Sequence, residues 1–220
     1  MTLRQAGARW ISLATAITAS ALAVPGTATA AQNDSDSPPS TPVTLEVQTV
    51  NGSGCPNGTA SVTASPGNTG FKIRYNDFTA RAGGSAGPTE FRRNCQVNLA
   101  VHIPQGFTVA VARADYVGRA RLADGASAKM RSNYYYQADP DNTWAEHAPI
   151  DGPYLGSWHT IDATDETNLV YAPCGETRLL NINTELRVDA GTATGSTNTM
   201  SMRSSEGEVY TAVQFSWLHC

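Results

Sequence analysis

Charge is scarce in this sequence. Only 15% of its 220 residues are Asp, Glu, Lys or Arg, and lysine occurs just twice, whereas globular domains average about 25% charged residues. A coiled coil or a charged disordered chain needs more charge, so both classes are excluded. A formal charge of −4 is unfavourable for holding a polyanion by bulk electrostatics, and no nucleic-acid partner is expected.

Long apolar runs are also scarce, and the one prolonged run lies within residues 1–30. No later segment approaches the roughly 20 apolar residues of a membrane-spanning helix, so no membrane insertion is expected. Nucleophile-elbow, zincin, calcium-loop, phosphate-loop and dinucleotide motifs are missing. The sequence therefore predicts no catalytic residue, and neither a metal nor another cofactor is expected.

The first 30 residues have the organisation of a secretory signal peptide. Two arginines precede an apolar stretch of about 15 residues, and Ala28-Thr29-Ala30 offers a small-residue cleavage site. Residues 31–42 are rich in Asp, Ser, Pro and Thr, which predicts a flexible linker. A single secreted domain is expected over residues 43–220. Its formal charge, without the two arginines of the signal, is −6.

Four cysteines, Cys55, Cys95, Cys174 and Cys220, lie in the exported part. An even number of cysteines in an exported chain indicates disulfides, and four cysteines allow three pairings. We favour Cys55–Cys95 with Cys174–Cys220, in which each bond closes a loop of about 40 residues and contributes roughly 3–4 kcal/mol. A zinc site is disfavoured because no two cysteines lie closer than 40 positions.

Apolar residues occupy nearly every second position in residues 71–75, 97–103 and 180–188. This period of two indicates half-buried strands. About eight to ten such strands, separated by turn signals, predict an all-β fold. We expect an antiparallel β-sandwich, jelly-roll-like or otherwise.

Three local features refine this prediction. The apolar parity changes within residues 107–121, which indicates a bulge or bend near Ala112–Ala114 or at Gly118. Asp124-Gly125 predicts a hairpin turn. A second hairpin is expected between residues 199–204 and the last strand.

Residues 138–168 show weak periodicity and predict one long loop region. This stretch is rich in aromatic and histidine side chains, namely Trp144, His147, Tyr154, Trp158 and His159. A loop of this length in a compact domain is usually functional or contains short elements. Residues 157–161 are a candidate for such a short strand.

Several motifs together resemble a known family. They are Gly54-Cys55-Pro56, residues 91–99 (FRRNCQVNL), Pro173-Cys174-Gly175, residues 180–188 (LNINTELRV), and Trp217 with Cys220. They resemble a family of small secreted disulfide-bonded proteins of filamentous bacteria and fungi, which is catalogued only as a domain of unknown function. The resemblance spans residues 54–220 and implies export and a disulfide-bonded domain. It implies no activity and no catalytic residue.

Two groups of side chains are candidates for binding a ligand. A strand face of amide, carboxylate and guanidinium groups can bond sugar hydroxyls, although a solvated sheet face has the same composition. Exposed aromatic rings stack on ligands, although they also close the end of a sandwich. The candidate residues are Tyr135, Trp144, His147, Trp158, His159, Asn181, Asn183, Glu185 and Arg187.

Three functions remain open. We favour a non-enzymatic module that binds an extracellular or cell-wall ligand such as polysaccharide. The second is a secreted hydrolase with a carboxylate or metal site near His147, His159 or Glu185, including a dyad of Glu185 with Asp115 or another acid at the roughly 5–10 Å of glycosidases. The third is an effector or inhibitor of another protein, which predicts a contiguous exposed apolar patch. A cleft shared by residues 138–168 and 181–189 would favour binding or catalysis.

Overall fold

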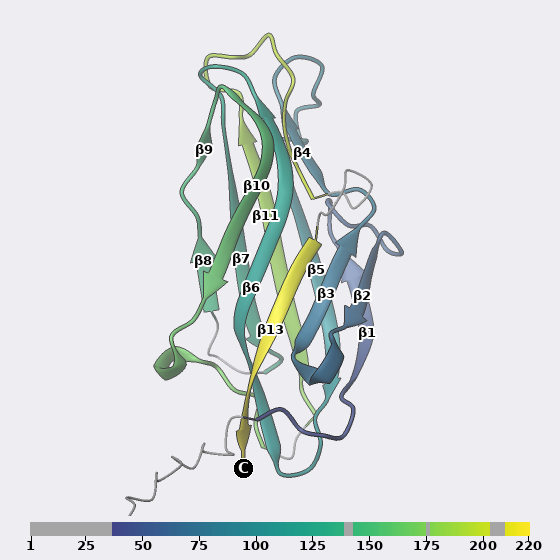
Figure 1. Cartoon of the computed structure of the whole chain (residues 1–220). Coiled ribbons are helices and arrows are strands. Elements are labelled where there is room, and N and C mark those ends of the chain that lie inside the picture. The colour runs from purple at the N-terminus through teal and green to yellow at the C-terminus, as the bar shows by residue number, and fades with distance from the viewer. Residues whose placement is uncertain (1–36, 139–142, 175–176, 203–209) are drawn as a thin grey trace, which may run out of the picture. The chain divides into compact units, whose positions relative to one another are not determined.

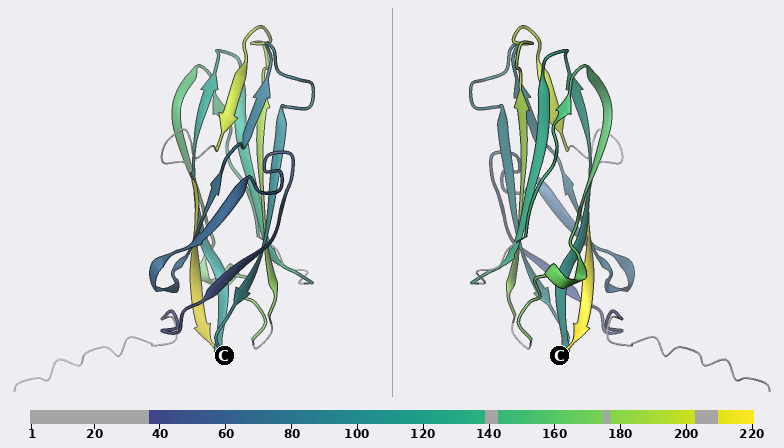
Figure 2. Two further views of the ribbon diagram at one scale, coloured as in Figure 1. Left: turned by 90° about the vertical axis from the view of Figure 1, so that its right-hand side faces the viewer. Right: turned by 90° about the vertical axis from the view of Figure 1, so that its left-hand side faces the viewer.

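Two antiparallel β-sheets face each other in the computed structural model of the chain (Figure 1). The structure describes residues 37–138, 143–174, 177–202 and 210–220. The signal-peptide segment, the first half of the expected linker, and Glu206-Gly207, the turn expected for the second hairpin, lie outside these described residues. The prediction of an all-β sandwich is confirmed, and Figure 2 shows its two layers from the sides.

Sheet A has the strand order β1-β5-β11-β7-β8, and β9 also pairs with β7. Its strands are β1 (Thr44–Asn51), β5 (Arg92–His102), β7 (Ser127–Tyr136), β8 (Thr143–Glu146), β9 (Ile150–Asp151) and β11 (Leu179–Asp189).

Sheet B has the order β2-β3-β13-β6-β12-β4, and β10 also pairs with β6. Its strands are β2 (Ala60–Ala64), β3 (Gly70–Tyr75), β4 (Thr79–Ala82), β6 (Phe107–Leu122), β10 (Tyr154–Ala163), β12 (Asn198–Ser201) and β13 (Tyr210–His219). Two short 3-10 turns, η2 (Pro66–Asn68) and η3 (Glu166–Asn168), complete the described elements.

The long strand β6 organises sheet B. Strand β13 pairs with its residues 107–117, β12 with 119–121 and β10 with 113–122. Since β10 overlaps both partners along β6, it occupies one edge, and β12 and β13 follow each other along the other. The expected hairpin between residues 199–204 and the last strand is therefore wrong, because β12 and β13 both pair with β6.

The turn at Asp124-Gly125 is present, but it does not close a hairpin. Ala126 N donates to Ala123 O across it at 3.1 Å. The strands on its two sides, β6 and β7, belong to different sheets. The turn therefore carries the chain from sheet B to sheet A, a step that local turn chemistry does not distinguish from a hairpin.

The predicted bulge in β6 is confirmed at Ala112. Gln214 of β13 pairs with Arg113, while the next residue, Phe215, pairs with Val111. Ala112 is the extra residue, so the inward parity changes there and places Ala114 and the following even positions in the core.

The predicted long loop at residues 138–168 contains β8, β9, β10 and η3, so the prediction of one loop region is wrong. The expected short strand at residues 157–161 belongs to the ten-residue β10. The apolar alternation of a strand is missing from β10, because its inward positions include Gly156, Thr160 and Asp162 as well as Trp158. The sequence therefore did not predict the whole strand.

Both predicted disulfides are confirmed. Cys55 bonds Cys95 and Cys174 bonds Cys220. The chain terminus is further held by a hydrogen bond of 2.9 Å from Cys220 N to Gly106 O. The last strand is thus fixed at its end.

The space between the sheets contains several tyrosines among its apolar side chains. Tyr75 and Tyr136 are almost fully buried, and their hydroxyls bond Thr211 and the carbonyl of Val109. Burial raises the pKa of Tyr75 to about 12. It also raises the pKa values of Tyr136, Tyr116 and Tyr134 above the ordinary value.

These shifts predict loss of stability in alkali. Since the folded-state pKa of Tyr75 exceeds its unfolded value, its contribution is fully present below about pH 10 and is lost as the pH rises through about 12, a loss of about 3 kcal/mol. Tyr75→Phe should lessen this loss. Urea unfolding near pH 8 and near pH 11.5 measures the loss in the free energy of unfolding. Equal alkaline losses in the wild type and in Tyr75→Phe would contradict the prediction.

Candidate ligand-binding face

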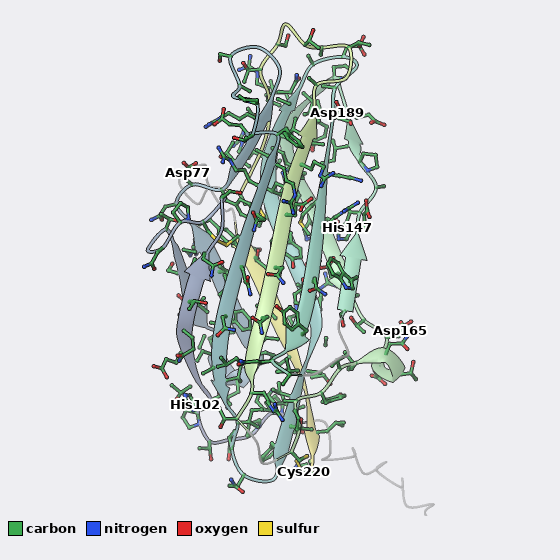
Figure 3. The ribbon with its side chains drawn as sticks, turned by 180° about the vertical axis from the view of Figure 1, so that it is seen from behind. Asp77, His102, His147, Asp165, Asp189 and Cys220 are labelled. Carbon is green, nitrogen blue, oxygen red and sulfur yellow. A yellow bond between two sulfur atoms is a disulfide. The ribbon has the colours of Figure 1, made fainter. Side chains whose placement is uncertain are left out.

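The outward side chains of β5, β11, β7 and β8 form one continuous polar surface, which we call the polar face of sheet A. Leu180, Ile182 and Leu186 of β11 point into the core, so the odd-numbered residues between them point outward. The face consists of Arg92, Asn94, Gln96, Asn98, Lys129, Arg131, Asn133, Tyr135, Trp144, Glu146, Asn181, Asn183, Glu185 and Arg187. Figure 3 looks onto it, with Asp189 at one end of β11 and His147 beside β7 and β8.

Carboxamides dominate one half of the polar face. Asn98 and Gln96 both donate to the Asn181 side-chain oxygen, at 2.8 and 3.3 Å. Asn183 donates to Asn133 at 3.5 Å, and Asn133 donates to the Thr143 carbonyl at 3.1 Å. Asn133 and Asn181 are each only 4% exposed. Burial and these hydrogen bonds together hold the amides in place.

Ion pairs occupy the other half. Glu185 accepts from Arg92 at 2.6 Å and from Arg187 at 3.1 Å. Glu146 accepts from Lys129 at 2.6 Å and from Arg131 at 2.8 Å, and these bonds lower the pKa of Glu146 to about 2. Four cationic and two carboxylate side chains thus stand on neighbouring strands.

The polar face is hollowed at two places. A hollow of about 310 Å³ is bordered by Trp144 together with Asn133, Asn183, Glu185 and Arg131. A second hollow, of about 360 Å³, shares Arg187 with the first and extends to Lys129, Glu146, His147 and Asp189. Trp144 is 72% exposed at the rim, so its ring is available to a ligand.

Six of the sequence-predicted candidates lie together on this face: Tyr135, Trp144, Asn181, Asn183, Glu185 and Arg187. His147 borders the second hollow. Residues 143–149 and 183–189 therefore meet in shared hollows, the arrangement that favours binding or catalysis. Sequence reasoning did not select Arg92, Asn94, Arg131 and Asn133, although they occupy the polar positions of alternating strands.

Trp158 belongs to the core, so its selection as a ligand-binding candidate is wrong. It is 4% exposed and pairs in register with Gly118 of β6. A Cβ atom on Gly118 would lie 2.3 Å from the Trp158 ring. The glycine thus makes room for the indole, and no bend is needed there.

The convergence of His147, His159 and Glu185 that the alternative of a hydrolase requires is not found. His159 lies on the outward side of sheet B, where it contacts Asp115 at 3.0 Å. Glu185 lies on the outward side of sheet A and is paired with arginines. Asp115 and Glu185 therefore face away from each other on different sheets and do not form a glycosidase dyad.

His147 joins a different arrangement. Its Nε2 donates to Asp162 at 2.5 Å, and its Nδ1 contacts the Thr160 hydroxyl at 2.8 Å. This hydroxyl–imidazole–carboxylate order resembles a hydrolase triad. However, Asp162 also accepts from Ser132 and Tyr134 inside the sandwich, and Thr160 is not among the residues that line the hollow beside His147. The geometry is that of a packed polar network.

Within the described ranges, no three His, Cys, Asp or Glu residues are placed to hold a metal ion, and no helix is long and apolar enough to cross a bilayer. The exposed large apolar side chains of these residues are Val47, Phe91, Trp144, Leu155 and Ile161. They come from strands of both sheets and from the segment before β5.

Comparison with known proteins gives a family and one relative. Residues 41–220 match the model of the domain-of-unknown-function family DUF4360. An "Uncharacterized secreted protein" of the fungus Arthroderma benhamiae is 35% identical over 147 residues, which are 64% of this chain and 58% of that protein. This chain thus spans little more than half the length of that relative.

The secreted relative and the two disulfides agree with the predicted export, since disulfides persist in oxidising compartments. The protein is a secreted one. The family match covers all the described strands. The chain belongs to the DUF4360 family.

Proposed function

We propose that the protein is a non-enzymatic module that binds an extracellular or cell-wall polysaccharide through the polar face of sheet A. The observation that supports this most is the position of Trp144. Its exposed ring borders a hollow whose other walls are carboxamide, guanidinium and carboxylate side chains. Sugars present both apolar ring faces and hydroxyl groups, and this hollow offers a partner for each.

The hydrogen-bonding groups suit sugar hydroxyls in kind. A hydroxyl both donates and accepts, and so does the side chain of Asn or Gln. Asn183 supplies both functions next to Trp144, and Glu185 adds a strong acceptor. Asn183 is hydrogen-bonded to Asn133, and Glu185 is held by Arg92 and Arg187, so little conformational entropy of these side chains is lost when a ligand binds.

Retention on insoluble polymers tests the proposal. The secreted domain should be retained on at least one of chitin, β-glucan, cellulose or peptidoglycan. Trp144→Ala should weaken binding at least tenfold, since aromatic side chains that become buried against the ligand carry much of the affinity at such sites. Asn183→Ala should weaken it as well. Soluble oligosaccharides of the retaining polymer then give the affinities by calorimetry.

Ile161→Ala is the matched control, because Ile161 is an exposed apolar residue on the outward side of sheet B. It should bind like the wild type. Circular dichroism and urea unfolding show whether each variant is folded. No retention on any of the four polymers, or equal binding by a folded Trp144→Ala variant, would count against the proposal.

A further inference from the structure

The outward side of sheet B carries a second, different surface. Two cross-strand rows run over β4, β12, β6 and β10. One row consists of Arg81, Thr199, Arg121 and Leu155, and the other of Thr79, Ser201, Arg119 and Ser157. Their chain neighbours Ala80, Met200 and Ala120 are buried in the core, so both rows face outward.

The spacing of these rows places three arginine residues around one threonine. Adjacent strands lie about 4.8 Å apart, so Arg81 and Arg121 flank Thr199 with backbones about 10 Å apart. Arg119 is two residues along β6 from Arg121, about 7 Å away. Arginine side chains are long enough to reach one oxyanion group above Thr199 from all three positions.

Two hollows follow these rows. One of about 390 Å³ is lined by Arg81, Arg119 and Arg121 together with Thr79, Thr199 and Ser201. The other, of about 650 Å³, shares Arg121 and Leu155 with it and continues to Ser196, Thr197 and Asn198. The shared residues make one groove, which we call the arginine groove. Its length suits an oligomer better than a single ion.

The groove is cationic in a chain of net negative charge. Among the described residues, no Asp or Glu lines either hollow. Glu90 pairs with Arg81 at 3.4 Å from outside the groove. Arg121 has no ion-pair partner among the described residues, and the buried hydroxyl of Thr79 has no hydrogen-bond partner there either.

We propose that the arginine groove binds an acidic polysaccharide, with its oxyanion groups held by Arg81, Arg119 and Arg121. Guanidinium groups match carboxylate and sulfate in a planar, bidentate geometry that lysine does not offer. The hydroxyl of Thr199 adds a donor between them. This site lies on the opposite sheet from the polar face and is independent of the function proposed there.

Binding of soluble polymers to the folded secreted domain tests this inference. Polygalacturonate supplies carboxylates, dextran sulfate supplies sulfates, and unsubstituted dextran is the neutral comparison. We expect binding to at least one acidic polymer, and no binding to dextran. Arg121→Glu should weaken acidic-polymer binding at least tenfold, and wild-type binding should weaken as salt is raised.

Arg74→Glu is the matched control, because Arg74 is an exposed arginine of the same sheet that lines neither hollow. It should bind acidic polymer like the wild type. Trp144→Ala should also leave this binding intact, and Arg121→Glu should leave retention on neutral polymers intact, so the two proposals fail separately. Equal weakening by both charge reversals, no binding to either acidic polymer, or tighter binding to a single-stranded oligonucleotide would overturn the inference.

Discussion

Replacing both Cys55 and Cys95 with alanine is expected to lower the free energy of unfolding by about 4 kcal/mol. The disulfide joins residues 40 positions apart, and its loss returns the freedom of that loop to the unfolded chain. The bond also ties the segment after β1 to β5, an inner strand of sheet A. Both cysteines are buried in the core, so the variant loses apolar packing in addition.

The second disulfide provides the comparison. Cys174 and Cys220 are 46 positions apart, and both are exposed. Cys174→Ala with Cys220→Ala therefore removes a similar loop constraint without a loss from the core, and its effect should be smaller. Urea unfolding followed by tryptophan fluorescence measures both. A loss below about 1 kcal/mol for the Cys55–Cys95 pair, or a larger loss for the terminal pair, would contradict this explanation.

The faces of the strands could be predicted from local sequence. In residues 180–188, apolar side chains alternate with Asn181, Asn183, Glu185 and Arg187, and the structure places the two sets on opposite sides of β11. The reason is that a one-residue slip would expose the whole apolar set. The parity change in β6 could also be predicted, because a bulge shifts the apolar alternation by one position.

The partners of each face could not be predicted in this way. Asn98 and Asn181 bond across 83 positions, and Trp144 reaches the polar face because β8 adds to the edge of β7. Nothing in the local periodicity of these segments specifies which strands lie side by side. The candidate site was therefore recognised in part as a stripe on one strand, without the arginines and amides that neighbouring strands contribute.

Trp158 shows a second limit. An aromatic residue in a weakly periodic, proline-containing segment predicts an exposed loop position. In β10, however, the inward positions next to Trp158 are Gly156 and Thr160, and Gly118 of β6 receives the indole. A buried ring beside a glycine and polar inward residues has no signature in the alternation, so its burial became evident only from the pairing of β10 with β6.

The other polar inward residue of β10, Asp162, is the centre of a network between the sheets. Its side chain is 5% exposed. It accepts hydrogen bonds from Ser132, from Tyr134 at 2.6 Å and from His147 at 2.5 Å. Tyr116 of β6 in turn bonds the Tyr134 hydroxyl. Because a carboxylate accepts only, all three direct partners must donate to Asp162.

Asp162→Ala is expected to lower the free energy of unfolding by about 3–5 kcal/mol. The substitution leaves several buried donors without an acceptor, and unpaired buried polar groups cost about 1–3 kcal/mol each. Asp162→Asn preserves the shape and one acceptor oxygen, so its loss should be smaller. Urea unfolding of both variants near neutral pH measures these differences.

Asp165→Ala is the matched control three residues later. Asp165 is exposed at the start of η3, where it makes no side-chain capping bond, and its removal should leave the free energy of unfolding unchanged.

Retention of Asp162→Asn on the polymer that binds the wild type adds a functional measurement. The network lies inside the sandwich, whereas the polar face lies outside sheet A, so a folded Asp162→Asn variant should bind normally. Stability of Asp162→Ala equal to that of Asp165→Ala would show that the network does not hold the two sheets together, and loss of binding in a folded Asp162→Asn variant would instead make Asp162 and His147 part of the ligand site.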